Sequence, residues 1–406
     1  MKITFADLFS GIGGFHLAFQ NVSNTENFIT ECLYASEIDR FAKDVYHNNF
    51  GFSIDRMLEI KELQNNITEK KLDVIFCGFP CQPFSSAGKQ KGFNDEGRGK
   101  LIFDVINFVK KTKPKVILLE NVKNLINHNN KETINKIVKE FDLAGYKLIS
   151  EEPEVLSPHQ FGIKQKRYRV FIPLVRKDLS NEKQNPKINK EDFMNKYIQN
   201  MNKILDDEVD EKYFLNDELN MVLNAWAEFV KKFRDENGRI PIFYIDDVVF
   251  GKKDTKKYQE YKWYKIYMDK MELFYKKNKK EIDEWILKYD VKNWTRKQYR
   301  KLEWQASNSD FNDTFLQIRQ SGMRFKKNDT FPTLVALVQT SIVYSKNQKR
   351  WRRLTPREVS RLQSFPENFI LSSDEHQAYK QFGNSVNVKV VEYIIRKYLL
   401  DVILKK

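Results

Sequence analysis

Short apolar runs alternate with helix-like stretches over roughly the first 175 residues of this 406-residue chain. Four of these runs are predicted strands, namely residues 3–9, 32–36, 72–77 and 115–119. Residues 101–111 show the amphipathic pattern of a helix, and runs 147–156 and 168–175 are predicted strands on either side of Gln165. Strands alternating with helices in this way are typical of an α/β protein with a doubly wound, Rossmann-like sheet.

A glycine-rich turn follows the first predicted strand, with Gly11, Gly13 and Gly14 ahead of a helix-like stretch. Glycine lets the backbone approach a ligand closely. Glu37 ends the next predicted strand, 23 residues after Gly14, where an acid can accept hydrogen bonds from a ribose. The dinucleotide pattern G-x-G-x-x-G is absent, because no glycine stands at or beside Leu17. The turn therefore favours an adenosine cofactor without a diphosphate, such as S-adenosylmethionine, over NAD.

Cys81 stands between two prolines directly after the third predicted strand. Pro80 fixes its own φ, and Pro83 disfavours helix at the residue before it. The thiol is therefore expected at a defined place on the carboxyl edge of the sheet, where ligands collect. A small buried hydrophobe is the alternative for any free cysteine, and it suits Cys77 and Cys32 better than Cys81.

Composition limits the classes of protein that the chain can belong to. Three widely spaced cysteines argue against a disulfide framework and for a reducing compartment. They lack zinc-ligand spacing, so we predict no structural metal. No apolar run reaches about 18 residues and the mean hydropathy is −0.62, so no membrane span is expected. The net charge of +15 favours a polyanionic partner, although lysine-rich chains without one also exist.

Residues 177 to about 348 differ in character, being rich in Lys, Asn, Asp and Tyr. Residues 251–300 hold 16 basic and 8 acidic side chains. Aromatic residues are interleaved with this charge, among them Tyr258, Tyr261, Trp263, Tyr264, Tyr267, Trp285, Trp294 and Tyr299. Basic and aromatic residues together suit a nucleic-acid surface. A helical domain with an aromatic core and a lysine-covered exterior explains the same pattern, and the sequence leaves both open.

Globular character returns near residue 350. Thr355, Pro356 and Glu358 suit the N-cap, N1 and N3 positions of a helix, and a final amphipathic helix follows. We therefore divide the chain at the changes in composition, into residues 1–176, 177–348 and 349–406. The third part is expected to complete the domain that the first part begins.

Five motifs in the two outer parts occur in a fixed order. They are Phe9-Ser10-Gly11-Ile12-Gly13-Gly14, Gly78-Phe79-Pro80-Cys81-Gln82, Glu120-Asn121-Val122, Gln165-Lys166-Arg167-Tyr168-Arg169 and Gly383-Asn384-Ser385-Val386. Together they resemble the motifs of the bacterial DNA (cytosine-5) methyltransferases, and the middle region adds only residues 319–322 and 333–335. That family keeps its target-recognition domain between the last two motifs. The resemblance implies a doubly wound Rossmann-like methyltransferase sheet with a second, smaller target-recognition domain.

The resemblance gives Cys81 the role of nucleophile. Cytosine C5 does not take a methyl group unaided, and a thiolate added to C6 makes it nucleophilic. Charge then develops at N3 and O2. The resemblance assigns Glu120 to N3, and Arg167, with Arg169 in support, to O2 and the thiolate. A carboxyl that donates to N3 needs a raised pKa, which burial can supply. Outside these motifs, Glu120 would be interpreted as a strand-end acid capping a turn, and Arg167 as half of a surface ion pair.

Two further groups of residues follow from the same resemblance. The cofactor-binding group is Phe9, Gly11, Gly13, Glu37, Ile38, Glu59, Asn384, Ser385 and Val386. Glu59 departs from the family, which has an aspartate at this position. The DNA-contacting group is Gln82, Ser85, Lys89, Arg98, Gln165, Arg319, Thr333 and Leu334. The target base must leave the duplex to reach Cys81, and the glycine-containing basic loop 85–99 is predicted to close over it.

The implied activity is sequence-specific DNA methylation, with S-adenosylmethionine as cofactor and double-stranded DNA as partner. It would serve a restriction–modification system whose cognate restriction endonuclease shares the site. We expect a monomer in the bacterial cytoplasm, associated with the nucleoid. Two alternatives stay open, a tRNA cytosine-5 methyltransferase of the same fold and a DNA-binding regulator built on an inactive methyltransferase. The long middle region argues against the first, and the complete catalytic set argues against the second.

Overall fold

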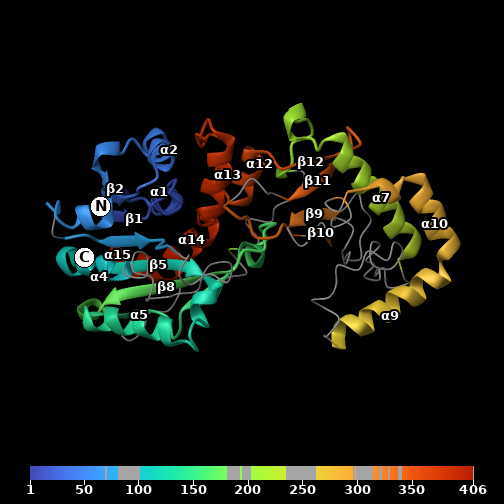
Figure 1. Cartoon of the computed structure of the whole chain (residues 1–406). Coiled ribbons are helices and arrows are strands. Elements are labelled where there is room, and N and C mark those ends of the chain that lie inside the picture. The colour runs from blue at the N-terminus through green and yellow to red at the C-terminus, as the bar shows by residue number, and fades with distance from the viewer. Residues whose placement is uncertain are drawn as a thin grey trace. The chain divides into compact units, whose positions relative to one another are not determined.

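The computed structural model describes residues 1–68, 71–80, 101–180, 193, 203–234, 262–295, 298, 314–319, 322–327, 330–336 and 341–405. The chain divides into two compact units, both traced in Figure 1. The first unit comprises Met1–Ile204, Pro332–Val338 and Pro356–Lys406. The second comprises Leu205–Phe331 and Gln339–Thr355.

In the described part of the first unit, an eight-stranded sheet forms the centre. Its strands are β1 (Lys2–Leu8), β2 (Ile29–Ser36), β3 (Met57–Leu58), β4 (Val74–Cys77), β5 (Val116–Val122), β6 (Tyr146–Leu148), β7 (Glu154–Leu156) and β8 (Arg169–Arg176). The order is β3-β2-β1-β4-β5-β8-β6, and β7 also pairs with β8. The first five strands in this order are parallel, and β8 is antiparallel to β5. The doubly wound α/β fold is confirmed.

The helices of this unit either follow strands of the sheet or come from the C-terminal part of the chain. They are α1 (Gly14–Glu26), α2 (Arg40–Phe50), α3 (Ile60–Leu63), α4 (Leu101–Thr112), α5 (Glu132–Leu143), α12 (Pro356–Leu362), α13 (Glu375–Asn384), α14 (Val388–Ile394) and α15 (Leu400–Leu404), with a π-helical turn at Ile395–Leu399. The strands predicted at 3–9, 32–36, 72–77 and 115–119 correspond to β1, β2, β4 and β5. The run 147–156 forms two short strands instead of one, because β6 and β7 pair with different parts of β8.

Apolar side chains cover both faces of the sheet. On one face, Ile75 of β4 packs in a buried cluster with Ile106 of α4 and Ile137 of α5. On the other face, the ring of Phe76 lies 5.2 Å from that of Phe19 in α1. Figure 1 shows α1 and α5 on opposite sides of the strands. None of the described helices combines the length and apolar character needed to cross a membrane.

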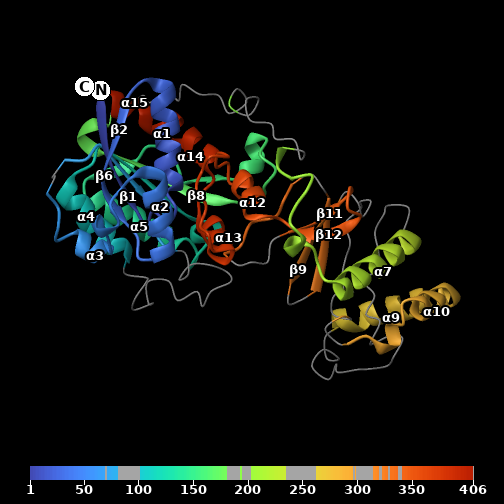
Figure 2. The same cartoon turned by 90° about the horizontal axis from the view of Figure 1, so that it is seen from above.

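The C-terminal helices complete the face that α1 covers. Asn21 Nδ2 of α1 donates a hydrogen bond of 2.7 Å to Glu392 Oε1 of α14, and Figure 2 shows these helices together. Residues Pro356–Lys406 therefore belong to the same unit as the first part of the chain.

The chain order reverses between β1 and β4, since β2 lies on one side of β1 and β4 on the other. Sheets of this kind bind ligands at the carboxyl ends of the strands beside such a reversal. The glycine turn after β1, Glu37 after β2 and Gly78 after β4 all lie at this edge. The topology thus brings two of the motifs and Glu37 to one place.

The second unit has an antiparallel sheet in order β10-β9-β11-β12 and three longer helices among its described residues. The elements are α7 (Asp217–Phe233), α9 (Lys262–Lys277), α10 (Lys279–Lys288), β9 (Thr314–Arg319), β10 (Gly322–Lys327), β11 (Ile342–Ser345) and β12 (Arg350–Arg353). Trp285 and Trp294 are buried in its core, and their indole N–H groups donate to Ala225 O and Tyr289 O. The aromatic-core explanation therefore holds for these two residues. The side chains of the other six aromatic residues named in the sequence analysis lie outside the described residues.

The borders between the units differ from those drawn at 177 and 348. Ile204 stays with the first unit, where its carbonyl oxygen accepts a hydrogen bond of 3.0 Å from Arg361 Nη1. Trp351 belongs to the second unit, because it pairs with Tyr344 across β11 and β12 and is buried in the core there. Residues 332–338 return to the first unit. Composition alone does not reveal these borders, since they depend on long-range packing.

Candidate active site

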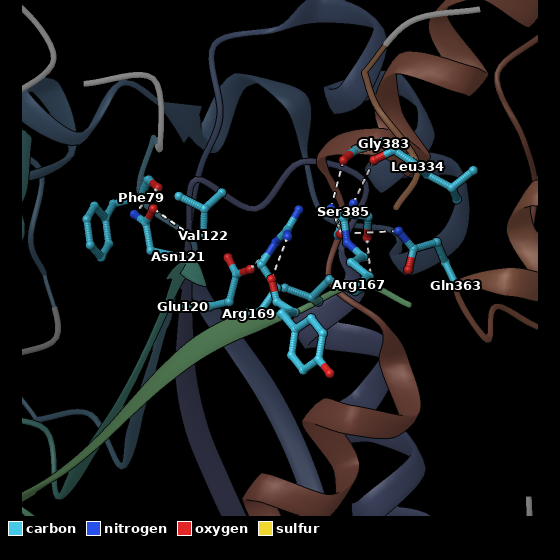
Figure 3. A network of polar contacts seen from close by, with 12 residues as sticks. Phe79, Glu120, Asn121, Val122, Arg167, Arg169, Leu334, Gln363, Gly383 and Ser385 are labelled. Carbon is cyan, nitrogen blue, oxygen red and sulfur yellow. Dashed lines mark hydrogen bonds and ion pairs between the residues drawn. The ribbon is translucent and has the colours of Figure 1, made fainter. Parts of the chain in front are cut away.

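Glu120 lies on β5 at the carboxyl edge of the sheet and is only 8% exposed. Its Oε1 atom is 3.1 Å from Nε of Arg169, the first residue of β8 (Figure 3). The antiparallel register pairs Val122 with Arg169, which brings the two side chains to the same end. Burial raises the pKa of Glu120, and the positive charges of Arg169 and Arg167 oppose the rise. The raised pKa favours the protonated carboxyl, the form that can donate a proton.

Cys81 lies outside the described residues, but the three residues before it are described. A Cβ built on Gly78 would lie 3.7 Å from Glu120 Oε2. Asn121 Nδ2 donates a hydrogen bond of 3.0 Å to Phe79 O. The end of β5 therefore contacts the segment that leads to Cys81. No role was predicted for Asn121, although its position directly after Glu120 in the motif indicates that it lies near the site.

The two arginines of the 165–169 motif have different surroundings (Figure 3). Arg169 contacts Glu120. Arg167 is 2% exposed, and its guanidinium donates to the backbone carbonyls of Leu334, Gly383 and Ser385. Arg169 is therefore the arginine that contacts Glu120, and the order of the two arginines at the target base stays a prediction. Main-chain oxygens occupy both terminal nitrogens of Arg167, and Arg169 is the cation in contact with Glu120.

The glycine turn after β1 has the backbone that its sequence predicts. Gly11 and Gly13 have φ values of +54° and +84°, in the left-handed region that glycine adopts readily. A Cβ at Gly13 would also lie only 2.2 Å from the ring of Phe50. Ser10 Oγ is buried and has no hydrogen-bond partner among the described residues. Phe9 packs at the edge of the buried cluster beneath the turn.

Glu37 connects this turn to the loop after β2. Its Oε2 accepts a hydrogen bond of 2.9 Å from Gly11 N, and its Oε1 accepts bonds from Ile38 N and Asp39 N. A carboxylate has about four acceptor sites, so these three bonds leave room for a ligand hydroxyl. Ile38 is 76% exposed, as an apolar contact for a planar base requires. Glu59 is exposed at the start of α3 and makes no capping hydrogen bond there.

The C-terminal motif reaches the same edge. A Cβ built on Gly14 would lie 2.8 Å from both Ser385 Oγ and Val386 Cγ2, so this motif packs directly on the start of α1. The Nζ of Lys380 in α13 is 2.6 Å from Asp39 Oδ2, which adds a second link. Asn384 is exposed at the end of α13. The orphaned Ser10 hydroxyl and the close-packed glycines fit a bound adenosine cofactor.

The described residues predicted to contact DNA differ in how far they are exposed. Gln165 is completely buried, and neither atom of its amide has a partner among the described residues. Leu334 is also buried, whereas Thr333 is exposed and its hydroxyl donates to Lys166 O. Gln165 and Leu334 are buried in the structure without DNA, and their contact with DNA stays a prediction. Gln82, Ser85, Lys89, Arg98 and the side chain of Arg319 lie outside the described residues.

We expect Glu37→Ala to weaken binding of S-adenosylmethionine by roughly 1.5–3 kcal/mol, the range for hydrogen bonds to a charged group. The reason is that the carboxylate both fixes Gly11 and keeps an acceptor site for the ribose. Calorimetry on the purified protein measures the change. Glu31→Ala is the matched control, since Glu31 lies on the same strand but pairs with Lys2. Equal affinity in wild type and Glu37→Ala would remove Glu37 from the site.

The doubly wound sheet, the glycine turn with its acid partner and the buried Glu120–Arg169 pair at the carboxyl edge define a Rossmann-like methyltransferase. Residues 3–399 match the family described as C-5 cytosine-specific DNA methylase. The chain belongs to this family and is a DNA (cytosine-5) methyltransferase.

Named relatives support the assignment over the whole chain. The type II methyltransferase M.BanI of Aneurinibacillus aneurinilyticus is 30% identical over 433 residues, covering 97% of this chain and 95% of the relative. M.HhaI of Haemophilus parahaemolyticus is 29% identical, covering 97% and 93%. The crystal structure of S. pombe Dnmt2 methyltransferase matches with a TM-score of 0.54 over 98% of each chain. Its identity of 18% makes it similar in fold alone.

Proposed function

We propose that this enzyme methylates C5 of a flipped-out cytosine in duplex DNA through a covalent adduct with Cys81, using S-adenosylmethionine. One observation carries the proposal: the buried Glu120 pairs with Arg169, and the next residue, Asn121, bonds to Phe79 in the segment that leads to Cys81. A nucleophile, a proton donor and a cation are the three groups that addition to cytosine requires.

In the proposed reaction the Cys81 thiolate forms a bond to cytosine C6. Glu120 gives its proton to N3, so the ring becomes an enamine without carrying a full negative charge. Arg169 holds its positive charge beside Glu120 and toward O2, and after transfer it stabilises the ionised carboxylate. Once C5 carries the methyl group, a solvent water accepts the C5 proton, the C6–S bond breaks to release the thiolate and the aromatic ring is restored, while the Glu120 carboxylate recovers the proton from N3.

S-adenosylmethionine supplies the methyl group when bound. The residues proposed to hold it are Phe9, Gly11, Gly13, Glu37, Ile38, Ser385 and Val386, with Asn384 and Glu59 at the margin of the group. Glu37 would accept a ribose hydroxyl, and Ile38 would lie against the adenine. The buried Ser10 hydroxyl is a further donor available to the cofactor.

We further propose that the second unit selects the DNA sequence while the first carries out the chemistry. The strong positive charge of residues 251–300 supports phosphate contacts. The relatives named type II methyltransferases support a role beside a restriction endonuclease with the same site. In that role a monomer would act on the bacterial chromosome, in the cytoplasm.

Transfer of a labelled methyl group from S-adenosylmethionine tests the proposal. Bacterial genomic DNA lacking cytosine methylation and bulk tRNA are offered side by side, and digestion of the product to nucleosides identifies the modified base. We expect 5-methyldeoxycytidine from DNA and no label in tRNA. Label in tRNA alone would identify an RNA enzyme, and no label in either would support an inactive regulator.

A further inference from the structure

Arg167 is a buried cation whose guanidinium donates three hydrogen bonds to main-chain carbonyls (Figure 3). Nη1 donates a hydrogen bond of 2.9 Å to Leu334 O, and Nη2 donates bonds of 2.7 and 2.9 Å to Gly383 O and Ser385 O. Its backbone N–H donates to Ser157 Oγ at 2.8 Å. A guanidinium stays charged when buried, so the bonds to these carbonyls offset part of the cost of burying the charge.

The acceptors come from two distant parts of the chain. Leu334 belongs to the return segment, residues 332–336, and the chain lies in the second unit both before Pro332 and from Gln339 onward. The return segment also packs against the end of α13, since a Cβ built on Gly383 would lie 2.4 Å from Val335 O. Arg167 thus holds the return segment and the turn at residues 383–386 together.

The 383–386 turn also packs against the glycine turn after β1 and the start of α1 (residues 9–14), the proposed cofactor loop. Ser385 Oγ and Val386 Cγ2 leave no room for a side chain at Gly14. Gln363 holds the same turn from its other side, with Nε2 donating a hydrogen bond of 2.7 Å to Phe382 O. Arg167 and Gln363 are thus two buried polar side chains that bond to the backbone at this turn.

We propose that Arg167, with Gln363, is a positioning residue that fixes the 383–386 turn against the cofactor loop and so sets the affinity for the cofactor. This inference rests on the proposed use of S-adenosylmethionine. It gives the two arginines of one motif separate tasks, because Arg169 acts at the Glu120 carboxyl while Arg167 acts through the 383–386 turn. Loss of Arg167 therefore affects cofactor binding first, and loss of Arg169 affects the chemical step first.

The test measures the dissociation constant for S-adenosylhomocysteine by calorimetry on the full chain without DNA, together with kcat and the KM for S-adenosylmethionine. Arg167→Lys keeps the charge but offers a single nitrogen where Nη1 and Nη2 of the arginine both bond to the backbone. We expect it to raise the dissociation constant at least about tenfold. Gln363→Leu is expected to raise it several-fold. Arg169→Lys is the matched comparison, with a dissociation constant within about twofold of wild type and a lowered kcat.

Folded Arg167→Lys protein that binds S-adenosylhomocysteine as wild type does would overturn the inference. If Arg167→Lys does not fold, Gln363→Leu decides, because unchanged affinity in that variant shows that anchoring of the turn does not set cofactor binding. Wild-type protein that fails to bind either S-adenosyl compound would instead contradict the proposed cofactor. The two failures are therefore distinguishable.

Discussion

Duplex DNA in which 5-fluorocytosine replaces cytosine is expected to convert the enzyme into a denaturation-resistant protein–DNA complex when S-adenosylmethionine is present. Once Cys81 is bonded to C6 and C5 is methylated, the reaction ends only when C5 loses its other substituent. A proton can leave as a cation and fluorine cannot, so the thioether bond persists. Replacing every cytosine makes the experiment independent of the recognition sequence. Gel electrophoresis under denaturing conditions measures the complex.

Cys81→Ser should abolish the adduct and lower turnover by on the order of 10⁴-fold or more, as loss of a nucleophile does. A serine alkoxide is far harder to generate near neutral pH than a thiolate. Cys77→Ala is the matched control. The Cys77 side chain is completely buried, and this burial raises the pKa of its thiol well above the usual range. An adduct that survives Cys81→Ser, or that peptide mapping places at Cys77 or Cys32, would contradict the mechanism.

Glu120→Gln is expected to slow adduct formation by roughly 10²–10⁴-fold, the usual contribution of general acid catalysis. The amide keeps the shape of the side chain and a hydrogen-bond donor, but it cannot transfer a proton to N3. The pH profile gives a second readout. The acid must be protonated to act, so wild-type activity should fall as the pH rises through the raised pKa of Glu120.

That fall at high pH should be absent in Glu120→Gln, because the amide does not titrate. Glu132→Gln is the control for the same chemical change at an exposed site, in the first turn of α5. A Glu120→Gln rate within about twofold of wild type, with an unchanged pH profile, would show that Glu120 is not the acid.

The strand-end positions of the site could be predicted from the sequence, because they depend on local pattern. Glu120 follows the apolar run 115–119, and Glu37 follows the run that became β2. Parallel strands that share an edge bring such residues together without further information. The glycine turn could also be predicted from local sequence, since Gly11 and Gly13 adopt backbone conformations that few other residues adopt.

The different tasks of Arg167 and Arg169 could not be predicted in the same way. Both residues stand in one short motif, and their surroundings depend on the register of β8 against β5, in which Arg169 opposes Val122. The partners of Arg167 lie 167, 216 and 218 residues further along the chain. The local sequence does not indicate such contacts. It also does not indicate that the return segment belongs to the first unit, so composition alone placed a border at residue 348.

The contact between α1 and α14 has a consequence for how the protein is made. Asn21 and Glu392 are 371 residues apart, and ribosomes add about 5–20 residues per second, so roughly 20–75 s separate the synthesis of the two helices. During that interval the surface of α1 that α14 covers lacks its final partner. The second unit is completed first, up to Thr355. The earliest part of the nascent chain is therefore among the last to reach its final packing.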